Sequence, residues 1–103
     1  MRQIINGKRY DTETAELIHE WSNGHYSTDF HYRSKGLWRT PAGTWFLAHD
    51  GGAMTDMATR HGDMTGGGHR IEPISSEDAF GFLVSHGGED AAETWFADHI
   101  ADA

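Results

Sequence analysis

The sequence predicts an α+β fold in which a small antiparallel sheet of about four to five strands packs with two C-terminal helices. The pair Asn6-Gly7 lies between two short β-prone runs, a pattern typical of a two-residue hairpin turn. Two aromatic-rich runs within residues 30–50 flank the turn sequence Thr40-Pro41-Ala42-Gly43. After Ser75, apolar side chains recur at helical spacing. Strands are therefore expected in the first half of the chain and helices at its end.

The N-terminal half begins with a hairpin formed by Gln3-Ile4-Ile5 and Lys8-Arg9-Tyr10. Both residues of its turn are expected at positive φ, which Asn and Gly tolerate. Residues 11–14, DTET, then predict a turn or a single helical turn. Periodicity leaves residues 15–21, AELIHEW, open between a short helix and a strand. We assign them to a third strand because of the family resemblance described below.

The core is expected on the hairpin within residues 30–50, which holds two of the four Trp and two of the five Phe residues. Alternate residues of a strand point to opposite faces, and Trp45 to His49 place apolar groups on both faces. This pattern indicates a strand in the middle of the sheet. The sequence Asp50-Gly51-Gly52 ends it.

Residues 51–70 are predicted to be a loop because they contain six glycines and three of the four methionines. A connection of this length is uncommon in a compact domain and is often functional or mobile. Met54, Met57 and Ala58 are compatible with a short helical turn that plugs the sheet. Residues 70–74 are expected to return to a sheet edge, because Pro73 cannot donate a ladder hydrogen bond.

Two helices are predicted after Ser75, which fits an N-cap with Asp78 at the third helical position. The first helix carries one apolar stripe: Ala79, Phe80, Leu83 and Val84. Gly87 fits the residue that follows a helix end. The second helix begins at about Glu89 and carries another apolar face: Ala92, Trp95, Phe96 and His99.

A chain of 103 residues predicts one domain with a β-rich part (1–50), a Gly/Met-rich loop (51–70) and an acidic helical part (71–103). The absence of cysteine excludes disulfides and thiolate chemistry. No apolar run approaches the roughly 20 residues that span a bilayer, and the N-terminus is too short and polar for a signal peptide. We therefore expect a cytoplasmic protein with no membrane partner.

The net charge of −8 is concentrated in the last third of the chain. Residues 71–103 contain eight Asp and Glu residues and no Lys or Arg. This charge layout disfavours nucleic acid and anionic membranes as direct partners and favours a basic protein surface. The predicted partner-binding residues are acidic: Glu77, Asp78, Glu89, Asp90, Glu93, Asp98 and Asp102.

Helix stability explains part of this acidity. Four of the seven residues are expected in the first turns of the two helices: Glu77, Asp78, Glu89 and Asp90. A carboxylate there interacts favourably with unpaired backbone N–H groups, by about 0.3 to 1 kcal/mol. The pairs Glu89/Glu93 and Asp98/Asp102 would instead repel each other at i,i+4 spacing. The acidic residues therefore have two possible interpretations: a solvated helix face and an acidic docking surface.

Eight histidines make a metal site an alternative. The residues His61, Asp63 and His69 share the glycine-rich stretch, and His25 and His31 flank another loop. Neither set has a recognised ligand spacing, so we predict no metal and no cofactor. The glycines at 66–68 lack the flanking strand, helix and Lys-Ser/Thr of a phosphate loop.

Catalytic residues are not predicted either. Carboxylates, histidines and serines occur, but no spacing indicates that three of them converge. The adjacent Ser85 and His86 are not expected to form a dyad, because neighbouring residues on a helix point about 100° apart. We therefore expect a protein that is not an enzyme.

Five stretches carry a family resemblance: IINGKRYDTETAEL at 4–17, LWRT at 37–40, GTWFL at 43–47, GGAM at 51–54 and ISSEDA at 74–79. Together they resemble a family of small uncharacterised accessory proteins of bacterial plasmids, integrative elements and phages. Mobile elements carry small acidic proteins that inhibit host restriction or CRISPR complexes. The resemblance thus implies an anti-CRISPR or anti-restriction role.

Charge and resemblance together predict a non-enzymatic, acidic interaction protein that inhibits a host nuclease or CRISPR effector complex by occupying its basic surface. DNA displays one negative charge per roughly 1.7 Å of duplex axis, so an acidic helix pair would act as a DNA mimic. One alternative is a small metal-binding module or enzyme that uses the loop histidines. Another is an antitoxin or regulator that binds a basic partner.

Overall fold

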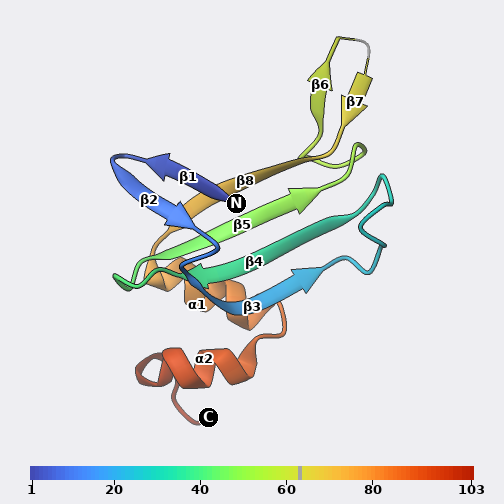
Figure 1. Ribbon diagram of the computed structural model, residues 1–103. Helices are drawn as coiled ribbons and strands as arrows, with labels where there is room; N and C mark the ends of the chain where they lie inside the picture. The colour runs from blue at the N-terminus through green and yellow to red at the C-terminus, as the bar shows by residue number, and fades with distance from the viewer. Residues whose placement is uncertain (63) are drawn as a thin grey trace.

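A four-stranded antiparallel sheet forms the centre of the computed structural model (Figure 1), which describes residues 1–62 and 64–103 and, at His61, the backbone alone. Its strands, in spatial order, are β3 (Glu16–Ser22), β4 (Arg33–Arg39), β5 (Trp45–Gly51) and β8 (Gly68–Ile74). Two further hairpins are β1 (Arg2–Ile5) with β2 (Lys8–Asp11), and β6 (Thr59–His61) with β7 (Met64–Gly66). The helical elements are α1 (Ser76–Ser85), α2 (Glu89–Trp95) and the 3₁₀ turn η1 (Ala97–His99). The predicted α+β fold is confirmed.

The N-terminal hairpin has the predicted turn, with Asn6 at φ 51° and Gly7 at φ 77°. It covers one face of the sheet with Tyr10, which is buried and meets the ring of Phe46 edge-on at 5.5 Å between centroids. Ile71 of β8 completes this small core. The hairpin therefore forms a layer opposite the helices (Figure 1).

The central hairpin pairs β4 with β5 from Arg33↔Gly51 to Arg39↔Trp45. Its turn closes where predicted, because the backbone N–H of Gly43 donates to the carbonyl of Thr40 at 2.8 Å. The core forms on this hairpin, as expected. Phe30, however, lies before β4 and is 67% exposed, so it contributes nothing to that core.

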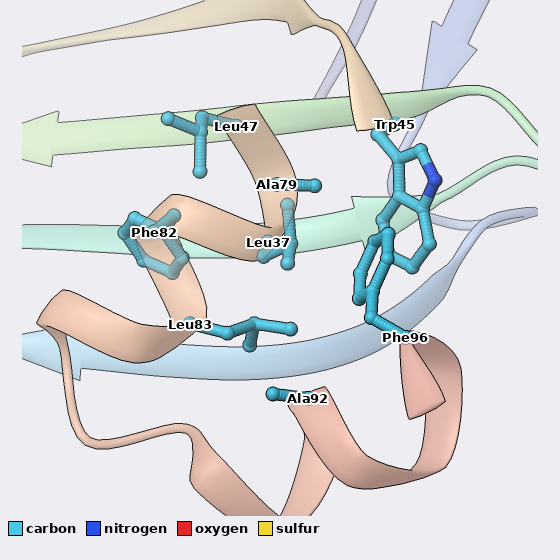
Figure 2. Packing of buried hydrophobic residues seen from close by; sticks show 8 residues of the cluster. All are labelled: Leu37, Trp45, Leu47, Ala79, Phe82, Leu83, Ala92 and Phe96. Carbon is cyan, nitrogen blue, oxygen red and sulfur yellow. The ribbon is translucent and has the colours of Figure 1, made fainter. Parts of the chain in front are cut away.

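The main core lies between the other face of the sheet and the two helices (Figure 2). Leu37, Trp45 and Leu47 contribute from the sheet. The helical side contributes a second set: Ala79, Phe82, Leu83, Ala92 and Phe96. The predicted stripe on α1 is wrong at one position, since Val84 is 53% exposed and Phe82 is buried in its place. The buried residues follow i, i+3, i+4 spacing from Ala79, which reaches 82 and 83 but not 84.

Both helix boundaries predicted from capping residues are confirmed. Ser75 caps α1, its side-chain oxygen accepting the backbone N–H of Asp78 at 3.1 Å. After α1, Gly87 adopts φ 76° and the N–H of Gly88 donates to the carbonyl of Leu83 at 2.7 Å. This bond satisfies one of the orphan carbonyls at the helix end and reverses the chain into α2.

The loop predicted over 51–70 is wrong from Thr59 onward. Residues 59–61 and 64–66 pair as the hairpin β6–β7, and β8 already begins at Gly68. These strands contain little apolar alternation, so backbone pairing alone reveals them. Ahead of them, residues 53–58 form consecutive turns in place of the predicted helical plug. Only Met57 is buried there, while Met54 is 64% exposed.

Candidate functional site

The seven predicted partner-binding residues are all exposed. Two of them, Glu77 and Asp78, occupy the first turn of α1, and Glu89 and Asp90 occupy the first turn of α2, as predicted. The others follow along the chain, with Glu93 on α2, Asp98 in η1 and Asp102 beyond it. We refer to all seven residues as the acidic band.

The helix pair divides the acidic band between its two ends. The ring of Phe80, in the first half of α1, lies 5.6 Å from that of Phe96 and 5.4 Å from that of His99. The beginning of α1 therefore lies beside the end of α2, and the two helices run antiparallel (Figure 1). Their acidic first turns consequently lie at opposite ends of the pair. The predicted Asp98/Asp102 pair is not helical, because η1 ends at His99.

The charge of the acidic band has no ion-pair partner within the described residues. Their three ion pairs are His25–Asp29, Arg33–Asp56 and His49–Glu72. Arg39 approaches the helices, but its guanidinium lies 5.0 Å from the ring centre of Trp95. This cation–π contact leaves the helical carboxylates exposed to solvent.

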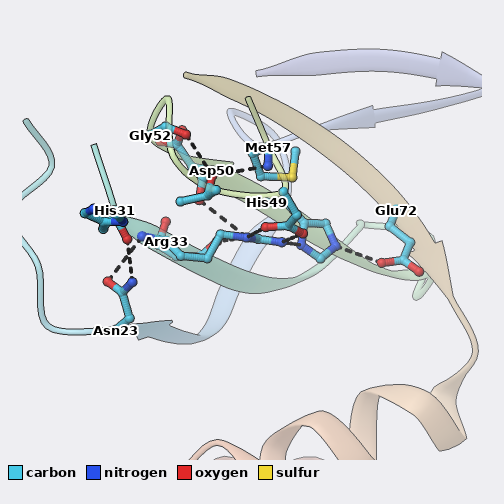
Figure 3. A network of polar contacts seen from close by, with 11 residues as sticks. Asn23, His31, Arg33, His49, Asp50, Gly52, Met57 and Glu72 are labelled. Atoms are coloured by element: carbon cyan, nitrogen blue, oxygen red, sulfur yellow. Dashed lines mark hydrogen bonds and ion pairs between the residues drawn. The ribbon is translucent and has the colours of Figure 1, made fainter. Parts of the chain in front are cut away.

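Sequence reasoning missed a second site, a polar network at the other end of the sheet (Figure 3). Arg33 of β4 donates through Nη2 to Nδ1 of His49 on β5 at 2.8 Å. The Nε2 atom of the same imidazole lies 2.7 Å from a carboxylate oxygen of Glu72 on β8. Arg33 also donates through Nε to Asp56 at 2.7 Å. The network thus joins three strands and the turn region that follows β5.

The protonation state of His49 follows from this geometry. A guanidinium can only donate, so Nδ1 is the unprotonated acceptor and Nε2–H donates to Glu72. The side chain of His49 is 5% exposed. Burial lowers the pKa of His49; the charge of Arg33 acts in the same direction, while the hydrogen bond to Glu72 opposes both. His49 is therefore neutral, with both ring nitrogens engaged.

A polar cavity of about 390 Å³ lies beside this network. Its lining includes Asp29 and Phe30 from the β3–β4 loop, Asp50 and Gly52 after β5, and the glycines 66–68. These glycines allow backbones to approach closely: a Cβ at Gly67 would lie 2.6 Å from the carbonyl oxygen of Gly51. The two carboxylates would repel an anion, which agrees with the sequence argument against a phosphate loop.

Of the two histidine sets predicted as alternative metal ligands, the pair His25 and His31 belongs to no group of three metal-ligand side chains in the described residues. The rings of His25 and His31 lie 6.1 Å apart, and His25 lies 3.7 Å from Asp29. Across the described residues, no three His, Asp or Glu side chains are arranged to hold a metal ion. The other set is left open, because Asp63 and the side chain of His61 lie outside the description.

Ser85 and His86 do meet, contrary to the sequence argument, with Ser85 Oγ 3.0 Å from His86 Nδ1. They can meet because His86 is the C-cap and has left helical geometry, at φ −120° and ψ 23°. Both atoms are engaged elsewhere, however. Ser85 Oγ donates to the carbonyl of Gly81 at 2.7 Å, and His86 Nδ1 lies 2.9 Å from the carbonyl of Phe82. This contact stabilises the helix end and does not activate the hydroxyl as a nucleophile.

Scans against protein-family models, curated proteins and solved structures found no match to this chain. The resemblance to accessory proteins of mobile elements therefore stays a prediction. Among the helices of the described residues, none is long and apolar enough to cross a membrane.

Proposed function

We propose that this chain is a non-enzymatic, cytoplasmic interaction protein whose acidic band binds the basic surface of a host nucleic-acid-binding defence complex and inhibits it. The observation that carries the proposal is the exposed, unpaired charge of the band. The segment 71–103 contains no Lys or Arg, and none of the band residues takes part in the three ion pairs of the described residues.

The band offers a partner exposed carboxylates at both ends of the helix pair instead of a single point charge. Carboxylates at both ends of the helix pair suit a basic groove that normally follows a nucleic-acid backbone. Because the charges are exposed, their attraction for such a groove should weaken as salt increases. The Arg or Lys residues of the partner would supply the opposite charge.

The structure indicates which carboxylates to neutralise in a binding test. Glu93, Asp98 and Asp102 lie outside the first turns of α1 and α2, so their loss spares the favourable interactions at those helix N-termini. The test variant is Glu93→Gln, Asp98→Asn and Asp102→Asn. A matched control removes three exposed carboxylates from the β3 region: Glu13→Gln, Glu16→Gln and Glu20→Gln.

The experiment is a pull-down from host lysate, followed by competition between the protein and DNA for the captured complex. The proposal expects a nucleic-acid-binding complex that the wild type and the control retain, that the test variant loses, and that DNA displaces. Equal capture by both variants would contradict a role for the band. Capture of a protein that binds no nucleic acid would contradict the inhibitor function while leaving an acidic docking surface.

A further inference from the structure

We infer that the chain Arg33–His49–Glu72 is a proton-operated latch, which holds the turn at Asp56 against the sheet while His49 is neutral and loosens that turn when the Nδ1 atom of His49 is protonated. This inference concerns the far end of the sheet from the helices and is independent of the proposed function.

Arg33 is the hub of the latch. Its side chain is 12% exposed, and its donors reach three separate segments. Nη1 donates to the carbonyl of Ser34 at 2.7 Å, and Nη2 donates to His49 at 2.8 Å. Nε and Nη2 contact the two carboxylate oxygens of Asp56 at 2.7 and 3.3 Å. Arg33 therefore joins β4, β5 and the turn after β5.

Asp56 depends on Arg33 for its position. Its side chain is 68% exposed, and the side-chain hydrogen bonds of its neighbours are local, from Thr55 Oγ1 to Gly52 and from the N–H of Met57 to Thr55 Oγ1. Within the described chain, the Arg33–Asp56 pair is thus the ion pair that ties Asp56 to the sheet, whereas Met57 beside it is held by its own burial, at 8% exposed. This turn leads directly into the β6–β7 hairpin.

A proton on His49 would break the latch at one defined bond. Nε2 already carries its hydrogen toward Glu72, so a second proton must enter at Nδ1, the atom that accepts from Arg33. The imidazolium and the guanidinium would then both offer hydrogen-bond donors and no acceptor, and their like charges would repel each other. The contact with Glu72 strengthens at the same time. His49 therefore stays in place and Arg33 moves.

Charged groups lie near His49 on both neighbouring strands. Lys35, the cross-strand partner of His49 on β4, lies with its Nζ atom 5.8 Å from the ring centre of Trp21. Arg33 on β4 and Arg70 on β8 disfavour the imidazolium, while Glu72 on β8 favours it. Asp56, on the other side of Arg33, is the partner that the guanidinium loses when it moves. Since burial opposes the charged form most strongly, the neutral, latched state is the one present at neutral pH.

The two acid-dependent events begin at different pH values. The pKa of His49 lies below its ordinary 6.5, so the unfolded chain takes up the proton first and the stability decreases as pH falls below 6.5 toward the folded value. The hydrogen bond from Arg33 lowers the pKa of Asp56 below its ordinary 3.8, so stability from that group is retained above 3.8 and lost below the lowered value. A change at pH values above 3.8 therefore does not arise from Asp56.

The test follows backbone amides of residues 55–57 and the ring of His49 by NMR between about pH 7.5 and about pH 4.5. The latch predicts that amide exchange at 55–57, corrected for its intrinsic pH dependence, becomes about tenfold faster, as expected for losing one charge-assisted bond. The midpoint of that change should coincide with the titration of the His49 ring. Titration of the ring without any change at 55–57 would overturn the inference.

Three variants isolate the latch. In His49→Asn, the side-chain oxygen can still accept from Arg33 but cannot be protonated, so the pH response at 55–57 should disappear. Exposed His25 is the matched control, and His25→Asn should keep the response. Asp56→Asn at an exposed site should give fast exchange already at neutral pH, without further change on acidification. A pH response that persists in His49→Asn, or one that Asp56→Asn leaves intact, would contradict the latch.

Discussion

The two ends of the central sheet are held together by different forces. At the helix end, Trp45 and Leu47 of β5 pack on apolar side chains of α1 and α2. At the loop end, the same strand continues through His49 to Gly51, where a polar network and close backbone approaches replace the apolar core. The strand β5 is therefore held by apolar side-chain packing at one end and by polar contacts and close backbone approach at the other.

The contrast shows why glycines gather where they do. A Cβ at Gly52 would lie 2.5 Å from the carbonyl oxygen of Asp29 and 2.6 Å from that of Phe30. At Gly68 it would contact the carbonyl oxygen of Met57. Gly52 and Gly68 are thus required by tight packing of the backbone, in contrast to the loop that the sequence suggested.

The largest effect is expected at the helix end. Replacing fully buried Leu83 by Ala should destabilise the fold by about 3 kcal/mol, because a cavity remains in the core. Urea denaturation measures the loss. Val84→Ala on the same helix is the control and should change stability by less than about 0.5 kcal/mol, since Val84 is 53% exposed. Similar losses in both variants would contradict the assignment of the buried face.

At the loop end, Gly52→Ala should destabilise by about 2 kcal/mol, because the added Cβ collides with two backbone carbonyl oxygens. Gly66→Ala is the matched control, since a Cβ there meets only Thr59 Oγ1 at 3.8 Å. Thermal unfolding of both variants compares the positions directly. Equal stability of the two variants would show that the loop end is less tightly packed than described.

A gain in stability is expected on the solvent side of the helix end. Gly81 lies inside α1 with open space around its Cα, so Gly81→Ala adds no collision. Alanine favours a helix by about 1 kcal/mol over glycine, and the variant should gain a similar amount in urea denaturation. A loss of stability in this variant would mean that the exposed face of α1 packs against another part of the protein.

The smallest effect tests the acidic band within α2. Glu89 and Glu93 repel each other at i,i+4, so Glu93→Gln should gain about 0.3 kcal/mol at low salt and lose this gain at high salt. Glu89→Gln removes the same repulsion together with a favourable first-turn carboxylate, and should gain less. Identical changes for both variants would show that helix position does not matter here.

Much of the fold could be predicted because its signals are local. Asn6-Gly7, Ser75 and Gly87 each determine the backbone within a few residues, and each lies where the sequence placed it. The hairpin β6–β7 could not be predicted, because its three-residue strands carry no apolar alternation. The exposure of the acidic residues was expected, but their division between two ends depends on how the helices pack.

The sequence by itself determined the two hairpin turns, the two helices and the location of the charge, because turns, caps and composition act over short distances along the chain. Only the tertiary structure brought Arg33, His49 and Glu72 together, since strand register joins residues that lie far apart in sequence. It also decided which glycines are required, because close backbone approach is a property of packed segments. A polar network and tight backbone packing both depend on residues that lie far apart in the sequence, so no local sequence pattern predicts them.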